Sequence, residues 1–211
     1  YHQVVSWPSY KYQGVKNLMP VTINGNGSIT GLSVGGLPNG TVDADTLASN
    51  AVTNSKLGPG AVINVTHGQH ATTGMLTQAT TFQKYDASDI TVTKLRGPGN
   101  VSGGSYLLVL AGAWIEFEGS GANSKHLAYS IMRDGTEVTG KTRGLGNLYS
   151  QNAQGYQSSA DMKYMDTANL NAGNYVYSLC ICNTNGGHNV QIGNASRLST
   201  WQILEIATWV T

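Results

Sequence analysis

Charge is scarce in this sequence of 211 residues. Charged side chains make up only 11% of it, whereas ordinary soluble domains contain about 25%. The 12 Lys and Arg nearly balance the 11 Asp and Glu, which leaves a net charge of +1. Nucleic acids and anionic surfaces are bound by clustered basic charge, so we expect no nucleic-acid partner. No apolar run approaches the ~18 residues of a membrane-spanning helix, and we expect no membrane insertion.

Cysteine is almost absent too, since the chain has only 2. Two cysteines cannot build a disulfide-rich scaffold. Cys180 and Cys182 stand two residues apart in YVYSLCICN, which has the composition of a strand. Side chains at this spacing point the same way but lie too far apart for comfortable bridging. We expect two small buried thiols.

Strong helix formers are also in short supply. The chain has 27 Gly and is rich in Thr, Ser and Asn, all of which favour turns and strands over helices. We expect a β-rich domain in residues 67–211, and together with AVINVT just before it the chain has the apolar runs of about eight or nine strands, at the spacing of an antiparallel sandwich. Within them, Asp134-Gly135 predicts a tight hairpin turn. The sequence therefore predicts an all-β, antiparallel β-sandwich.

The segment SYLLVLAGAWIEFEG is apolar on both sides of its expected strand. One face carries Leu107, Val109, Ala111, Ala113, Ile115 and Phe117, and the other carries Tyr106, Leu108, Leu110 and Trp114. A strand with two apolar faces needs cover on both sides. We expect the second face to contact sister subunits.

A strict five-residue rhythm marks residues 24–66. Aliphatic side chains recur there at Leu32, Leu37, Val42, Leu47, Val52, Leu57 and Val62. Neither a strand nor a helix keeps residues at this spacing on one side, so each unit must bend. So thin a repeat cannot bury its own aliphatic groups, and we interpret it as a stalk of several chains around one axis. The alternative is a flexible linker, which does not explain the register.

Residues 1–23 form a third region, an N-terminal arm. Trp7, Tyr10 and Tyr12 beside Pro8 have the composition of an anchoring peptide, because aromatic side chains supply interface energy at low entropic cost. We expect this arm to dock on a partner protein. A disordered terminus is the alternative.

Two stretches resemble a known family. Residues 19–57, MPVTINGNGSITGLSVGGLPNGTVDADTLASNAVTNSKL, resemble the stalk or attachment segments of tailed-bacteriophage fibre proteins. Residues 104–211 resemble the fibre-tip jelly roll that is similar to tumour-necrosis-factor and complement head domains, in the order YLLVLAGAWIEF, IMRDGTEV, LNAGNYVYSL and STWQILEI. The resemblance implies a homotrimer on the outside of a virion, with other virion proteins as partners and a tip that binds host surfaces.

Catalytic motifs are missing from the sequence. Glu116 and Glu118 are two carboxylates on one strand face, whereas a glycosidase needs them on opposite sides of a bond. We expect no enzyme and no cofactor. His67 and His70 in HGQH could surround a metal if three copies met on an axis. The alternative, histidines of a glycine turn that bind backbone, is the one we favour, and so we predict no metal site.

The long polar loops offer a surface for a ligand. Aromatic faces stack on sugars while amides pair with hydroxyls, so a saccharide would suit a set of loop residues. The set comprises Asn147, Tyr149, Gln151, Asn152, Gln154 and Tyr156. Ordinary loop solubility is the alternative for any one of them.

These features together predict a non-enzymatic structural protein of a bacteriophage virion. We expect a homotrimeric tail fibre or spike whose tip binds a host-surface glycan. A capsid head fibre or decoration protein is the main alternative, which would leave the protein on the head rather than the tail. A glycan-degrading tailspike is a further one, but it requires a carboxylate pair that the sequence does not show.

The stalk hypothesis can be tested by substitution. Replacing Val42, Leu47, Val52 and Leu57 with Ser removes the aliphatic groups that the chains would share, so we expect weaker assembly. Sedimentation of the variant and the parent over a dilution series measures this. A variant that assembles as tightly as the parent would contradict the stalk.

Overall fold

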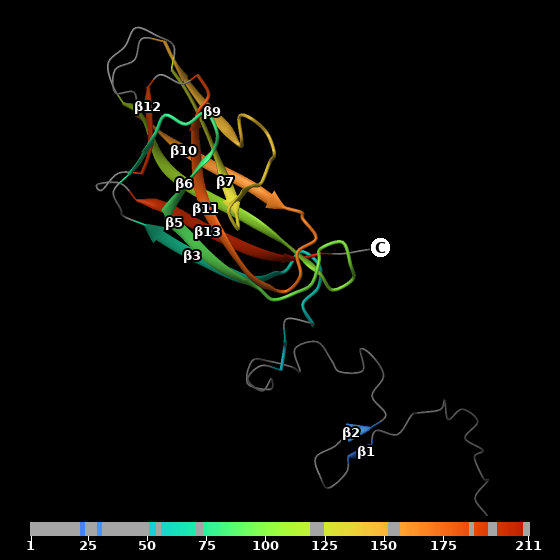
Figure 1. The fold of residues 1–211 in the computed structure, drawn as a ribbon. Coiled ribbons are helices and arrows are strands. Elements are labelled where there is room, and N and C mark those ends of the chain that lie inside the picture. Colours follow the sequence, from blue (N-terminus) through green and yellow to red (C-terminus); the bar gives the residue numbers. More distant parts are fainter. Residues whose placement is uncertain are drawn as a thin grey trace, which may run out of the picture. The chain divides into compact units, whose positions relative to one another are not determined.

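In the computed structural model the chain divides into two compact units, Tyr1–Val52 and Thr53–Thr211. In the first unit, β1 (Thr22–Ile23) pairs antiparallel with β2 (Ile29–Thr30). All other described strands belong to the second unit (Figure 1). The structure describes residues 22–23, 29–30, 51–53, 56–70, 74–118, 125–151, 157–185, 188–193 and 198–208.

The predicted stalk reaches the described residues only near its end. Val52 is 55% exposed, and Leu57 is partly buried. Val62 opens the first strand of the sandwich, which therefore begins before residue 67, the boundary that we expected. The reason is that residues 62–66 pair with the last strand of the chain. The remaining predicted stalk and arm residues lie outside the described residues: Leu32, Leu37, Val42, Leu47, Trp7, Tyr10 and Tyr12.

The first sheet of the sandwich has six strands, all paired antiparallel. Four of them run side by side: β3 (Val62–His70), β13 (Ser199–Ala207), β6 (Ser105–Glu118) and β10 (Gln157–Asp166). Strand β13 pairs with residues 105–112 of β6. Residues 115–118 of β6 pair instead with β12, and β12 pairs in turn with β4. These two strands are β12 (Asn189–Ile192) and β4 (Met75–Thr77).

The second sheet has five strands, also antiparallel. They are β5 (Gln83–Lys94), β11 (Gly173–Asn183), β7 (Lys125–Arg133), β8 (Thr136–Glu137) and β9 (Gly146–Ser150). Between β7 and β8, Asp134 and Gly135 both have positive φ, 49° and 80°. These values match the tight turn that joins hairpin strands with the natural twist, so the predicted Asp134-Gly135 hairpin is confirmed.

Successive long strands alternate between the two sheets. Strands β5, β7 and β11 lie in the second sheet, and β6, β10 and β13 lie in the first. Such alternation between two sheets is typical of a jelly roll. The predicted all-β antiparallel sandwich is confirmed. Within the described ranges there is no α-helix, and hence none long and apolar enough to cross a membrane.

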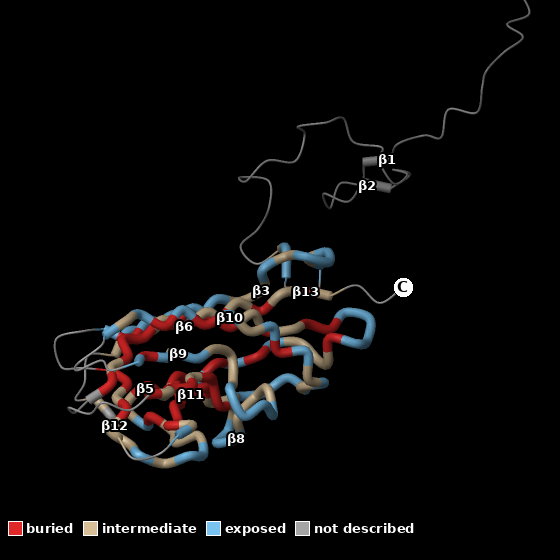
Figure 2. Tube along the Cα trace, turned by 90° about the horizontal axis from the view of Figure 1, so that it is seen from above, coloured by how far each residue is buried: buried red, intermediate tan, exposed pale blue. Residues whose placement is uncertain are grey.

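The core lies between the two sheets, where Figure 2 shows the buried residues in red. One side of β6 enters it through Leu107, Val109, Ala111, Ala113, Ile115 and Phe117, each at most 7% exposed. Opposite them stand the fully buried Leu179 and Ile181 of β11. Each large aliphatic or aromatic side chain buried in this way contributes roughly 1.5–3 kcal/mol. The period of two along β6 thus fixes which residues hold the sheets together.

Hydrogen bonds with buried polar side chains hold the loop that joins β5 to β6. The carboxylate of Glu205, with no exposed surface, accepts hydrogen bonds from the backbone N–H groups of Leu95 and Arg96 at 2.8 Å and from the Ser105 hydroxyl at 2.5 Å. The Lys94 ammonium donates to the carbonyls of Arg96 and Gly97, both at 2.6 Å. Burial lowers the pKa of Lys94, and the negative charge of Glu205 opposes that shift. The end of the sandwich with this loop is called the base below, and the opposite end the distal end.

A second buried carboxylate, Asp166, lies near the base. It accepts hydrogen bonds from the guanidinium of Arg133 and from the phenol of Tyr177, the latter at 2.7 Å. Burial, followed by the Asp166 charge, raises the pKa of Tyr177. Since β10, β7 and β11 supply the three groups, the cluster ties the two sheets to each other.

We predict that Glu205→Ala lowers the free energy of unfolding by roughly 3 kcal/mol, because two backbone N–H groups and one buried hydroxyl lose their acceptor. Glu205→Gln keeps one acceptor oxygen and should lose less. Denaturant unfolding of both variants measures the difference. Equal stability of Glu205→Ala and the parent would contradict this role.

Candidate functional site

The chain covers part of the outer face of its second sheet, over β7 and β11, with its own residues. Along β11 the side chains of Leu179 and Ile181 belong to the core, so the alternate residues Cys180 and Cys182 face outward, yet both are at most 1% exposed. Residues 137–145, called the strap below, lie over this face. The strap begins at Glu137, whose carboxylate accepts a hydrogen bond from the Ser130 hydroxyl of β7.

The strap is held closely against the sheet. Its Leu145 N–H donates to the Tyr129 carbonyl at 3.1 Å. At Gly144 a side chain would not fit, because a Cβ atom would lie 2.6 Å from Ser130 Cβ and 2.7 Å from Phe82 Cζ. The strap and Phe82 therefore meet at Ser130 of β7, the residue that pairs with Cys180. Burial raises the pKa of Cys180 and of Cys182, and both are free thiols, as the sequence predicts.

We predict that neither thiol reacts with iodoacetamide in the native protein at pH 8, because the reactive thiolate is disfavoured and covered. In denaturant both should be alkylated. Glu137→Ala, which loosens the strap, should speed native labelling, as intact-mass spectrometry would show. Rapid labelling of the native parent would contradict the cover.

The outer face of the first sheet is different, because apolar side chains there stay partly exposed. Two cross-strand rows near the base carry them. One row runs Val62, Ile206 and Tyr106, and the next runs Val65, Leu204, Leu108 and Met165. Val62, Val65 and Met165 are 47%, 48% and 42% exposed. Single exposed apolar residues are ordinary, whereas a contiguous patch marks an interaction surface. These seven residues are called the apolar rows below.

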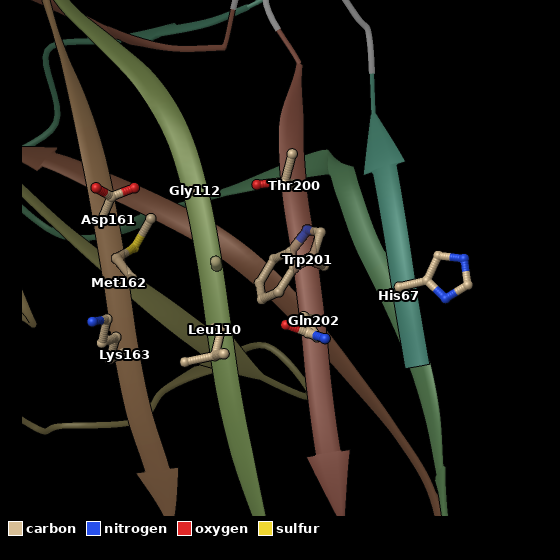
Figure 3. A pocket seen from close by; sticks show the side chains of 10 residues that line it. His67, Leu110, Gly112, Asp161, Met162, Lys163, Thr200, Trp201 and Gln202 are labelled. Atoms are coloured by element: carbon tan, nitrogen blue, oxygen red, sulfur yellow. The ribbon is translucent and has the colours of Figure 1, made fainter. Parts of the chain in front are cut away.

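Next to the apolar rows, farther from the base, the same face is hollowed. Figure 3 shows the floor, Gly112 of β6, between Asp161 of β10 and Thr200 of β13. This Gly112 hollow has a volume of about 470 Å³, and Lys163, Gln202 and His67 complete its rim. A neighbouring depression of about 450 Å³ shares Gly112, Asp161 and Thr200 and continues toward the distal end to Trp114, Ser159 and Leu198. The face thus passes from apolar rows to a hollow that both polar and apolar residues line.

Sequence reasoning found the apolar half of this face and missed the hollow. The second face of β6 was predicted from Tyr106, Leu108, Leu110 and Trp114. Gly112 is the one residue without a side chain in that series, and this gap was the signal in the sequence that could have indicated the hollow. The walls could not be found, because Asp161 and Thr200 come from strands far away in the sequence and meet only through register.

The residues predicted to bind a saccharide lie elsewhere, toward the distal end. Asn147 and Tyr149 are exposed on the edge strand β9, and Gln151 follows it, also exposed. The Tyr149 ring is 48% exposed and meets the His126 ring edge-on, with centroids 4.5 Å apart. The structure therefore brings three predicted residues to one exposed edge. Asn152, Gln154 and Tyr156 lie outside the described residues.

The two histidines weighed as metal ligands do not come together within the chain. We expected a glycine turn at HGQH, but these residues continue β3, because residues 67–70 pair with β13. Gly68 faces inward, where a Cβ atom would lie 3.0 Å from Ile90 Cδ1. His67, one residue away, is exposed on the outer face, and His70 lies on the inward side with Gly68. Within the described ranges no three His, Cys, Asp or Glu residues form a metal-binding group.

The protein is thus an antiparallel β-sandwich with two unlike outer faces. On one face its own chain covers Cys180 and Cys182, and on the other the apolar rows stay partly exposed. No protein-family model matches the chain, and no curated protein matches it in sequence. Solved structures do show a distant likeness.

Two of these structures are viral particles. A chain of the T13 IBDV viral particle is 10% identical over 70% of this chain and 37% of its own length, with a TM-score of 0.33. A chain of Infectious Bursal Virus derived T=1 particles is 14% identical over 69% of this chain and 36% of its own, with a TM-score of 0.31. The likeness thus spans little more than a third of either viral chain.

A third is the CBM22-1 xylan-binding domain of Xyn10C from Paenibacillus barcinonensis. It is 11% identical over 67% of this chain and 94% of its own, with a TM-score of 0.26. All three TM-scores fall below 0.5, so no argument about function rests on these likenesses.

Proposed function

We propose that the protein is a homotrimeric, non-enzymatic structural protein of a bacteriophage virion, a tail fibre or spike with a host-binding tip. The observation that carries the proposal is the unequal cover of the two outer faces. The strap covers the part of the second sheet around Ser130 and Cys180, whereas the first sheet exposes the apolar rows. An apolar surface of this kind gains free energy when a partner removes it from water.

Copies of the same chain are the partner that best fits this surface. The five-residue rhythm from Leu32 to Val62 independently favours several chains around one axis. Val62 belongs both to that rhythm and to the apolar rows, so the same assembly can bury both. The number three comes from the resemblance of the stalk segment to phage fibres.

The two ends of the sandwich differ in a way that suits a head projecting from a fibre. The chain arrives and leaves at the base, where Gly60 donates a hydrogen bond to the Ala207 carbonyl at 2.8 Å. Strands β6, β9 and β11 end at the distal end, as Figure 1 shows. Exposed Asn147, Tyr149 and Gln151 lie toward that end and offer amides and an aromatic ring to a saccharide. Three heads on one fibre would raise avidity even if each site were weak.

We predict that the parent has a molar mass three times that of one chain, measured by light scattering after size exclusion. Leu108→Lys places a charge in the middle of the apolar rows and should shift the mass toward one chain while the β-sheet circular dichroism persists. Thr91→Lys, on the exposed outer side of β5, is the matched control and should leave the trimer intact. A monomeric parent would overturn the homotrimer.

The place on the virion is a separate question with its own experiment. Immunogold labelling of intact particles with an antibody to residues 53–211 should decorate the tail. Decoration of the head alone would favour a capsid fibre or decoration protein and overturn the tail assignment.

A further inference from the structure

Gly112 stands in the interior of β6, where glycine weakens a strand because it has no side chain to pack and loses much backbone freedom. Glycine inside a strand usually marks a bulge, a sharp bend or the close approach of another group. At Gly112 the pairing continues without a register shift, to Asp161 on one side and Thr200 on the other. Its φ is not positive. The close approach of another group is the reason that remains.

The described atoms of the chain do not themselves require glycine at this position. A Cβ atom on Gly112 would lie 3.0 Å from Thr200 Oγ1 and 3.5 Å from Asp161 Oδ1. Both atoms are the ends of side chains of exposed residues, which can move by a few tenths of an ångström. Glycine here preserves the hollow itself, which no side chain of the described residues fills.

The hollow carries one charge of each sign. Asp161 and Lys163 are two residues apart on the outer side of β10, and both are exposed. Among the described residues neither has an ion pair or a hydrogen bond from its side chain. A surface with adjacent opposite charges is complementary to a copy of itself, whereas a polyanion or a polycation would meet one repulsive charge. The hollow is also continuous with the apolar rows through Leu110.

We propose that the Gly112 hollow receives a side chain of a second copy of this protein, and that Asp161 of one copy pairs with Lys163 of the next. This inference rests on the proposed homotrimer and deepens it. Around a threefold axis the pairs form a ring of alternating charge. The hollow then determines the register of the subunits, while the apolar rows supply most of the buried apolar surface.

Gly112→Gln tests the hollow, because its side chain projects outward and fills the space without adding apolar surface. The variant should fold with the parent's β-sheet circular dichroism, and its trimer should dissociate at a concentration about tenfold higher or more. Thr91→Gln places the same side chain on the other outer face and should assemble like the parent. A Gly112→Gln trimer as tight as the parent would overturn the proposal and leave the homotrimer standing.

A charge exchange identifies the occupant. Asp161→Lys and Lys163→Asp should each weaken assembly by placing like charges together, and the double variant should restore it. Single variants that assemble like the parent, or a double variant that stays weak, would overturn pairing between copies. A parent that is monomeric at every concentration would overturn both this proposal and the homotrimer, and is thereby distinguishable from a failure of the hollow alone.

Discussion

The alternation of β6 is the constraint on which the rest of the structure depends. One side of this strand closes the core through Leu107, Val109 and Phe117, and the other side is apolar as well near the base. Because a strand presents alternate residues to opposite faces, a shift of one residue would exchange the two sets. Pairing with β13 and β10 holds the register, and so it decides where both the core and the apolar rows lie.

The two outer faces show two ways to remove apolar surface from water. On the second sheet the strap covers Cys180 and Cys182 within the chain. On the first sheet the described residues provide no comparable cover, and the apolar rows stay partly exposed. At the base, buried Glu205 and Asp166 hold the loop after β5 and the junction of the sheets. These buried carboxylates thus lie at the same end of the sandwich as the apolar rows.

Much of the fold could be predicted because it depends on local patterns. The all-β class, the Asp134-Gly135 turn, the two buried thiols and the inward set of β6 were all confirmed. The glycine turn at His67–His70 was wrong, because pairing with β13 extends β3 through Gly68. The stalk, the homotrimer and the saccharide site stay predictions, since they depend on other chains or on ligands.

The sequence by itself determined the strands, their two-sided alternation and the absence of a disulfide scaffold, because composition and a period of two act over a few residues. Only the tertiary structure decided which outer face is covered and what surrounds Gly112. The strap reaches across the second sheet, and Asp161, Gly112 and Thr200 come from three strands. Register between distant segments brings such residues together, and one chain's local pattern does not encode that register.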